Sequence, residues 1–105
     1  GHKVSLPEVE RAFDTFPHLG EVVAVALDDA NLGSLIALVI EEGGTEGQGP
    51  GADKAALLEH ARARLAPQFV PRRIYVLERL PRTVGGKIRR AETARLIMDG
   101  QGERL

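Results

Sequence analysis

The stretch that decides the predicted fold is residues 22–40, VVAVALDDANLGSLIALVI. Two apolar runs of strand length, residues 22–27 and 35–40, flank a polar turn at residues 28–33. This pattern predicts two antiparallel strands joined as a hairpin. Neither run alternates polar with apolar residues, so we expect helices to cover both faces of the sheet.

A first helix is predicted before this hairpin, over residues 5–16. Apolar side chains recur there at helical spacing and would form one buried stripe. Ser5 and Glu8 have the spacing of a capping box, in which each side chain accepts a free backbone N–H at the helix start. Pro17 cannot continue a helix and is expected to end it.

The remaining elements are predicted after the hairpin. Residues 43–51 hold five glycines and are expected to form a flexible surface loop. A helix follows over residues 53–65, a third strand over 73–77 and a last helix over 90–98, while residues 100–105 are expected to fray. The sequence therefore predicts an α+β fold, with a small three-stranded, mainly antiparallel sheet flanked by about three helices.

Composition limits the classes of protein to which the chain can belong. A length of 105 residues with 43% hydrophobic content fits one domain over residues 1–105. The absence of cysteine excludes disulfides, thiolate metal sites and cysteine nucleophiles, and it favours a reducing, cytoplasmic setting. No apolar run approaches the roughly 20 residues that a membrane-spanning helix needs. We therefore expect a chain without a membrane span.

Charge is distributed unevenly along the chain. Residues 1–61 hold 3 basic and 11 acidic residues, whereas residues 62–95 hold 10 basic and 2 acidic ones, a local charge of about +8. Such a segment favours an anionic partner, whether a phosphate, a nucleotide or a nucleic acid. The alternative is that most of these arginines simply lie on solvated helix and strand faces.

Residues 80–90, LPRTVGGKIRR, contain the strongest candidate for chemistry. The stretch fails the P-loop pattern, because Ile88 follows the lysine where that pattern requires Ser or Thr, and no glycine stands five residues before Gly86. Glycine pairs allow a loop to approach a ligand closely, and a lysine is a compact point charge with three donors. Lys87 is thus suited to delivering positive charge to an anionic centre formed elsewhere.

Metal binding is not indicated by the sequence. The three histidines, His2, His18 and His60, are far apart and lack ligand-like spacing. We therefore predict no metal site in this chain.

Three motifs, in order, carry a resemblance to a known family. They are GHKVSLPEVE at residues 1–10, RLAPQFVPRRI at 64–74 and LPRTVGGKIRR at 80–90. With the hairpin between the first two, they resemble the C-terminal domain of the adenylate-forming enzymes: acyl- and aryl-CoA synthetases, adenylation domains of nonribosomal peptide synthetases, and luciferases. The resemblance covers nearly the whole chain.

The resemblance implies a mobile lid domain in a two-step ligase. Members of the family make an acyl-adenylate from a carboxylic acid and ATP, and then usually transfer the acyl group to the thiol of CoA or of a phosphopantetheine arm. A large N-terminal adenylation domain, absent here, holds most of the acid, ATP and Mg²⁺ sites. The small domain closes over it and rotates between the half-reactions, so the chain alone is expected to be inactive, whether it is an excised piece or a natural freestanding domain.

Site residues follow from the same resemblance. Lys87 matches the catalytic lysine of adenylate formation, and Thr83, Gly85 and Gly86 match the loop that carries it. Residues 1–4 match the segment that lines the pantetheine channel after rotation, and they are the remnant of a short hairpin. Those four residues are Gly1, His2, Lys3 and Val4.

Further contacts are expected at the basic residues of this region. Arg72, Arg73 and Arg82 are candidates for contacts with CoA phosphates or with an acidic acyl or peptidyl carrier protein. Pro81 and Lys87 also fit a pattern that resembles an acetylation site, where acetylation would remove the lysine charge.

Two alternative functions stay open from the sequence. The chain can be the lid of an adenylation domain that docks a carrier protein during peptide synthesis. It can also be a small basic nucleic-acid-binding module, although only four aromatic residues are present and none is arranged for stacking on bases. We expect no nucleic-acid partner.

Overall fold

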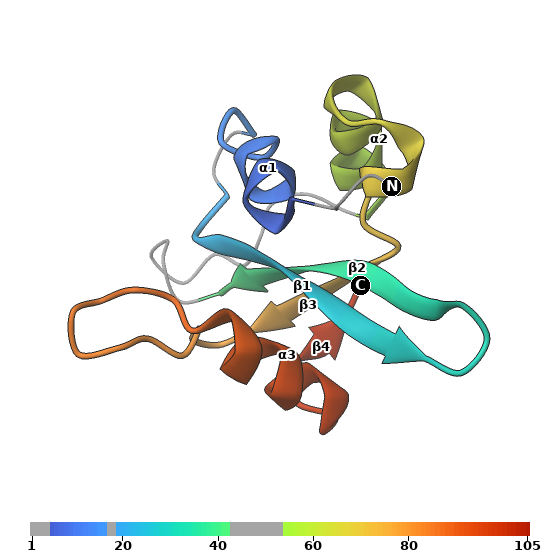
Figure 1. The fold of residues 1–105 in the computed structure, drawn as a ribbon. Helices are drawn as coiled ribbons and strands as arrows, with labels where there is room; N and C mark the ends of the chain where they lie inside the picture. Colours follow the sequence, from blue (N-terminus) through green and yellow to red (C-terminus); the bar gives the residue numbers. More distant parts are fainter. Residues whose placement is uncertain (1–4, 17–18, 43–53) are drawn as a thin grey trace.

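The computed structural model describes residues 5–16, 19–42 and 54–105. Its sheet has four strands in the spatial order β1-β2-β3-β4, and its helices lie on both faces (Figure 1). The strands are β1 (Val22–Asp29), β2 (Gly33–Glu41), β3 (Arg73–Leu77) and β4 (Glu103–Arg104). The helices are α1 (Leu6–Arg11), α2 (Lys54–Arg64), the 3₁₀ turn η1 (Pro67–Phe69) and α3 (Arg90–Met98).

The predicted hairpin is confirmed. Strands β1 and β2 pair antiparallel from Val22 opposite Ile40 to Asp29 opposite Gly33. Strand β3 then runs parallel to β2, since the chain crosses over through α2, and β4 returns antiparallel to β3. The sheet is therefore mixed, with the hairpin as its longest pairing.

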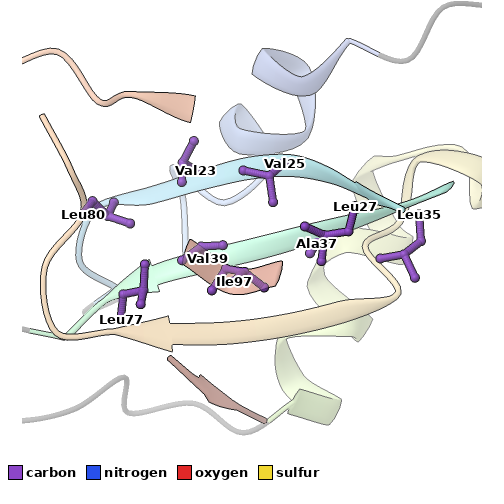
Figure 2. Packing of buried hydrophobic residues seen from close by; sticks show 9 residues of the cluster. All are labelled: Val23, Val25, Leu27, Leu35, Ala37, Val39, Leu77, Leu80 and Ile97. Atoms are coloured by element: carbon purple, nitrogen blue, oxygen red, sulfur yellow. The ribbon is translucent and has the colours of Figure 1, made fainter. Parts of the chain in front are cut away.

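Helices cover both faces of the sheet, as the unbroken apolar runs predict. Helix α3 lies on one face, and α1 and α2 lie on the other (Figure 1). The α3 face carries a cluster of buried side chains, drawn in Figure 2: Val23, Val25, Leu27, Leu35, Ala37, Val39, Leu77, Leu80 and Ile97. The opposite face holds Phe13, Leu38, Ile40, Leu57, Ala61 and Ile74. Alternate residues of the same strand thus enter different layers of the core.

The first helix is shorter than predicted. Helix α1 ends at Arg11, and the next residues continue as turns with i→i+3 bonds, for example from the Phe16 amide to the Phe13 carbonyl at 3.0 Å. Ser5 occupies the cap position, but its side chain makes no capping hydrogen bond. Its carbonyl accepts the Glu8 amide instead, at 3.1 Å. Pro17, residues 43–51 and Asp53 lie outside the described residues.

The predicted strand count is wrong, because the C-terminal end forms β4 instead of fraying. Arg104 pairs with Tyr75, and the Leu105 amide donates to the Ile74 carbonyl at 2.8 Å. Gly100 and Gly102 both have positive φ, 92° and 84°, which turns the chain back after α3. Strand β3 and helix α3, by contrast, have the predicted bounds. None of the helices within the described residues is long and apolar enough to cross a bilayer.

We predict that Gly102→Ala destabilises the protein more than Gly100→Ala. Each substitution places a Cβ at positive φ, which costs about 1–2 kcal/mol. At Gly102 the new Cβ would also lie 3.1 Å from the Val76 carbonyl oxygen, whereas nothing lies within 4 Å at Gly100. Urea denaturation of both variants measures the difference. Equal losses of unfolding free energy would contradict the close packing of this end against β3.

Candidate functional site

Lys87 lies on a short hairpin between β3 and α3, the orange loop in Figure 1. Arg82 and Ile88 form the isolated bridge at its base. The Thr83 amide donates to the Lys87 carbonyl at 2.8 Å, and the Lys87 amide donates to the Thr83 Oγ1 at 3.2 Å. The Gly86 amide closes the turn on the Thr83 carbonyl at 2.9 Å. Thr83 is therefore the residue that fixes the backbone around Lys87.

The two glycines before Lys87 have different roles. Gly86 has φ of 91°, a left-handed conformation that favours glycine, and a Cβ there would meet nothing within 4 Å. Gly85 has no such conformation, and its Cβ would make an ordinary contact 3.8 Å from the Thr83 Oγ1. The requirement for glycine in this loop is thus conformational and falls on Gly86.

The side chain of Lys87 is exposed at the end of this hairpin. It contributes to a pocket of about 310 Å³, whose charged lining residues are Glu10, Glu21, Arg82, Lys87 and Arg90. Arg82 and Arg90 each pair with a carboxylate, whereas no carboxylate of the described residues forms an ion pair with Lys87. The lysine charge is therefore accessible to an external anion.

Arg82, expected as a CoA or carrier contact, lies in a bidentate ion pair. Its two guanidinium NH groups donate to the two oxygens of Glu41, at 2.7 and 3.0 Å. The Leu80 amide donates to the same carboxylate at 2.8 Å. The Arg82 hydrogen bond, followed by the Leu80 amide, holds the pKa of Glu41 below its ordinary value despite the opposing effect of burial. Glu41 was not identified from the sequence.

The structure does not bring the three candidate arginines together. Arg73 pairs with Asp29 at 2.9 Å, near the β1–β2 turn, while Arg82 lies at the opposite end of β2. Arg72 lines a groove of about 570 Å³ beside α2, together with Lys54, Arg62 and the apolar Leu58. Of these three, Arg72 has its guanidinium in no ion pair with a described residue.

Asp29 is a second carboxylate that holds a fixed geometry. Its Oδ1 accepts the amides of Asn31 and Leu32, at 2.8 and 2.9 Å. These bonds, with Leu32 first and the Arg73 charge adding to them, lower the pKa of Asp29. This cluster closes the β1–β2 turn and lies away from the Lys87 hairpin.

A second ion pair holds the returning leg of the Lys87 hairpin. Arg90 donates from Nη2 to the Glu10 Oε2 at 2.7 Å and from Nε to the Ala24 carbonyl at 3.0 Å. The Ala24 amide donates to the same Glu10 oxygen at 2.9 Å. Together the two side chains cover backbone groups on the edge strand β1. The partners are 80 residues apart, so spacing gave no signal for them.

Within the described residues, His60 has a structural contact, and no cluster of metal ligands is found. The His60 Nε2 donates to the Ala12 carbonyl at 2.8 Å, and its ring meets Phe16 edge-on with ring centroids 5.0 Å apart. It therefore joins α2 to the turns after α1. The part of the chain that the structure describes holds no group of three or more His, Cys, Asp or Glu that could bind a metal ion. His18 and the predicted channel residues 1–4 lie outside the described residues.

The chain is similar to known proteins over most of its length. The sequence model of the family described as AMP-binding enzyme C-terminal domain matches residues 8–87. The chain is 32% identical over 97 residues to the mitochondrial malonate–CoA ligase of Bos taurus, covering 92% of this chain and 16% of the ligase. It is 36% identical over 101 residues to the isonitrile lipopeptide synthase of Streptomyces coeruleorubidus, covering 94% of this chain and 6% of the synthase.

A solved structure agrees with the fold. The fatty acyl CoA synthetase of Mycobacterium tuberculosis superposes with a TM-score of 0.81 at 22% identity, covering 95% of this chain and 19% of that one. At this level of identity the likeness speaks for the fold alone. The chain thus spans less than a fifth of the length of each of these three proteins.

We predict that the Glu41–Arg82 pair makes the protein more sensitive to acid. Because the pKa of Glu41 is lowered by folding, the stability it contributes is present above the ordinary glutamate pKa and is lost as the pH falls through the folded-state pKa. Between about pH 5 and 3 the unfolding free energy of the wild type should therefore fall more steeply than that of Glu41→Gln. Urea denaturation at several pH values measures this, and parallel curves would contradict it.

Proposed function

Because the chain belongs to the family of AMP-binding enzyme C-terminal domains, we propose that it is the mobile lid of an ATP-dependent, AMP-forming acid–thiol ligase and that Lys87 is its catalytic residue. The observation that carries this proposal is the accessible charge of Lys87, at the end of a hairpin that is anchored at both legs. The family match extends to this residue.

The first half-reaction requires two anions to meet. A carboxylate oxygen of the acid attacks the α-phosphorus of ATP, the bond from that phosphorus to the bridging oxygen breaks, and pyrophosphate leaves. An ammonium group between the carboxylate and the α-phosphate offsets their repulsion and stabilises charge that develops in the transition state. Lys87 serves this step as a protonated donor and does not need to lose its proton.

The hairpin explains how a small domain delivers that charge. Thr83, Gly85, Gly86 and Lys87 are all exposed, so this segment can enter a site on another domain without unpacking the core. Rotation of the lid then withdraws Lys87 and presents another face for thioester formation. Residues 1–4 would face the pantetheine channel in that second state.

The rest of the site belongs to a domain outside this chain. The chain covers 16% of the malonate–CoA ligase, so a large N-terminal domain has ample length to hold the acid and ATP. Mg²⁺ would be held there as well, because the described residues of this chain offer no cluster of metal ligands. We therefore expect the 105-residue domain alone to be inactive.

The acyl acceptor is CoA or the phosphopantetheine arm of a carrier protein. The malonate–CoA ligase among the relatives favours CoA, whereas the 36% identity to a lipopeptide synthase favours a carrier protein. Arg72, beside its groove, is the candidate arginine whose guanidinium stays available for either acceptor's negative charge. Competition between CoA and a phosphopantetheine-loaded carrier protein for the same acyl-adenylate separates the two.

Acetylation of Lys87 would switch off the first half-reaction. The ammonium is exposed and therefore accessible to a modifying enzyme. An acetylated lysine is neutral and no longer offsets the repulsion between the two anions.

We predict that Lys87→Ala lowers acyl-adenylate formation on the order of 10²–10³-fold in the full-length protein that carries this domain. Thioester formation from supplied acyl-adenylate should survive, since it does not use the lysine. Single-turnover assays of the two half-reactions measure both effects. Equal losses in both half-reactions would contradict the role of Lys87.

A further inference from the structure

We propose that the Glu41–Arg82 ion pair is a positioning device that aims Lys87 during acyl-adenylate formation. This inference rests on the proposed catalytic role of Lys87. Arg82 is the bridge partner of Ile88, the residue directly after Lys87, and Glu41 is the last residue of β2. The pair therefore connects the base of the loop to β2, an inner strand of the sheet.

The tip of the Lys87 hairpin depends on its base for orientation. Residues 83–87 are all exposed, and Val84 is fully so. The hydrogen bonds given by Thr83, Gly86 and Lys87 within the described structure stay inside the hairpin. A tip that makes no hydrogen bond to the described part of the domain body takes the direction that its two legs impose.

The geometry of the pair suits this task. When two parallel hydrogen bonds join a guanidinium to a carboxylate, they fix the relative orientation of the two planar groups as well as their distance. The Glu41 side chain is 11% exposed and that of Arg82 is 32% exposed, so water competes weakly at the carboxylate. The Leu80 amide adds a third bond to Glu41, and the Leu80 side chain is buried in the α3-side core.

The returning leg is held independently. Arg90 follows Lys87 by three residues and binds Glu10 of α1 and the Ala24 carbonyl of β1. The two legs are thus tied to two different strands. Loss of either tie should let the hairpin swing about the other, which would displace the Lys87 ammonium. A displacement on the order of 1 Å can cost about 10²-fold in rate.

The chain supplies two variants of the pair and a matched control. Glu41→Gln keeps the volume of the side chain. Its amide NH2 is a donor and cannot bond to a guanidinium, which has only donors, so the bidentate geometry is lost. Arg82→Lys keeps the charge and loses the two-bond geometry. Asp29→Asn is the control, because Asp29 also binds an arginine and backbone amides and its side chain is 14% exposed. It ends β1 opposite Gly33, at the end of the β1–β2 hairpin away from Glu41.

The test uses the full-length protein with three measurements. Single-turnover assays follow acyl-adenylate formation and, separately, thioester formation from supplied acyl-adenylate. Hydrogen exchange of the peptide covering residues 83–88 reports order in the hairpin without reference to catalysis. Urea denaturation reports overall stability.

We expect Glu41→Gln and Arg82→Lys each to lower adenylate formation about 10–100-fold, with thioester formation unchanged and faster exchange at residues 83–88. The double variant should lose little more than either single one, because the two side chains act as a unit. Asp29→Asn should leave adenylate formation and this exchange unchanged.

Two results would overturn the proposal. One is adenylate formation and exchange at wild-type levels in both pair variants. The other is equal loss in both half-reactions together with lowered stability, which a merely structural role would give. Lys87→Ala is run alongside: if it forms adenylate at the wild-type rate, the proposed function fails, and the exchange data alone decide whether the pair orders the hairpin.

Discussion

The two hydrogen bonds between Glu41 and Arg82 join the buried strand β2 to the exposed loop that carries Lys87. Glu41 ends a strand whose residues 37–40 are fully buried, while Arg82 begins a hairpin whose residues 83–87 lie in solvent. A loop of five exposed residues has no core to hold its shape, so polar contacts at its base must do so. Two carboxylates, Glu41 and Glu10, supply those contacts from elements far away in the sequence.

The ion pairs of the domain also reduce the positive charge that the basic segment, residues 62–95, offers to a partner. The sequence places ten cationic residues within residues 62–95, which suggests a surface for phosphates or nucleic acids. In the structure Arg73, Arg82, Arg90 and Arg95 each pair with a carboxylate of the same domain. Four of the ten cationic charges are therefore neutralised locally. Lys87 and Arg72 are among the six cationic residues of this segment that form no ion pair with a described residue, so their charge stays available to an anionic ligand.

The sequence predicted those elements whose signal is local. Strands β1 and β2 follow from continuous apolar runs, and the bounds of β3 and α3 match those predicted. The resemblance of residues 80–90 to a family motif singled out Lys87. Strand β4 was missed because two glycines with positive φ look like a flexible end until the partner strand is known. Glu41 and Glu10 were missed for a related reason. Their arginine partners lie 41 and 80 residues away in the sequence, so no local sequence pattern connects the two members of each pair.

The central claim is that this domain brings Lys87 to the reacting anions and holds it there through the base of its hairpin. A crystal structure of the full-length protein with a non-hydrolysable acyl-adenylate analogue tests it most directly. We predict the Lys87 Nζ at hydrogen-bonding distance, about 2.7–3.2 Å, from an oxygen of the phosphate-mimicking group or of the acyl carbonyl, with the Glu41–Arg82 pair intact. An ordered, closed complex in which Lys87 points into solvent would contradict the account.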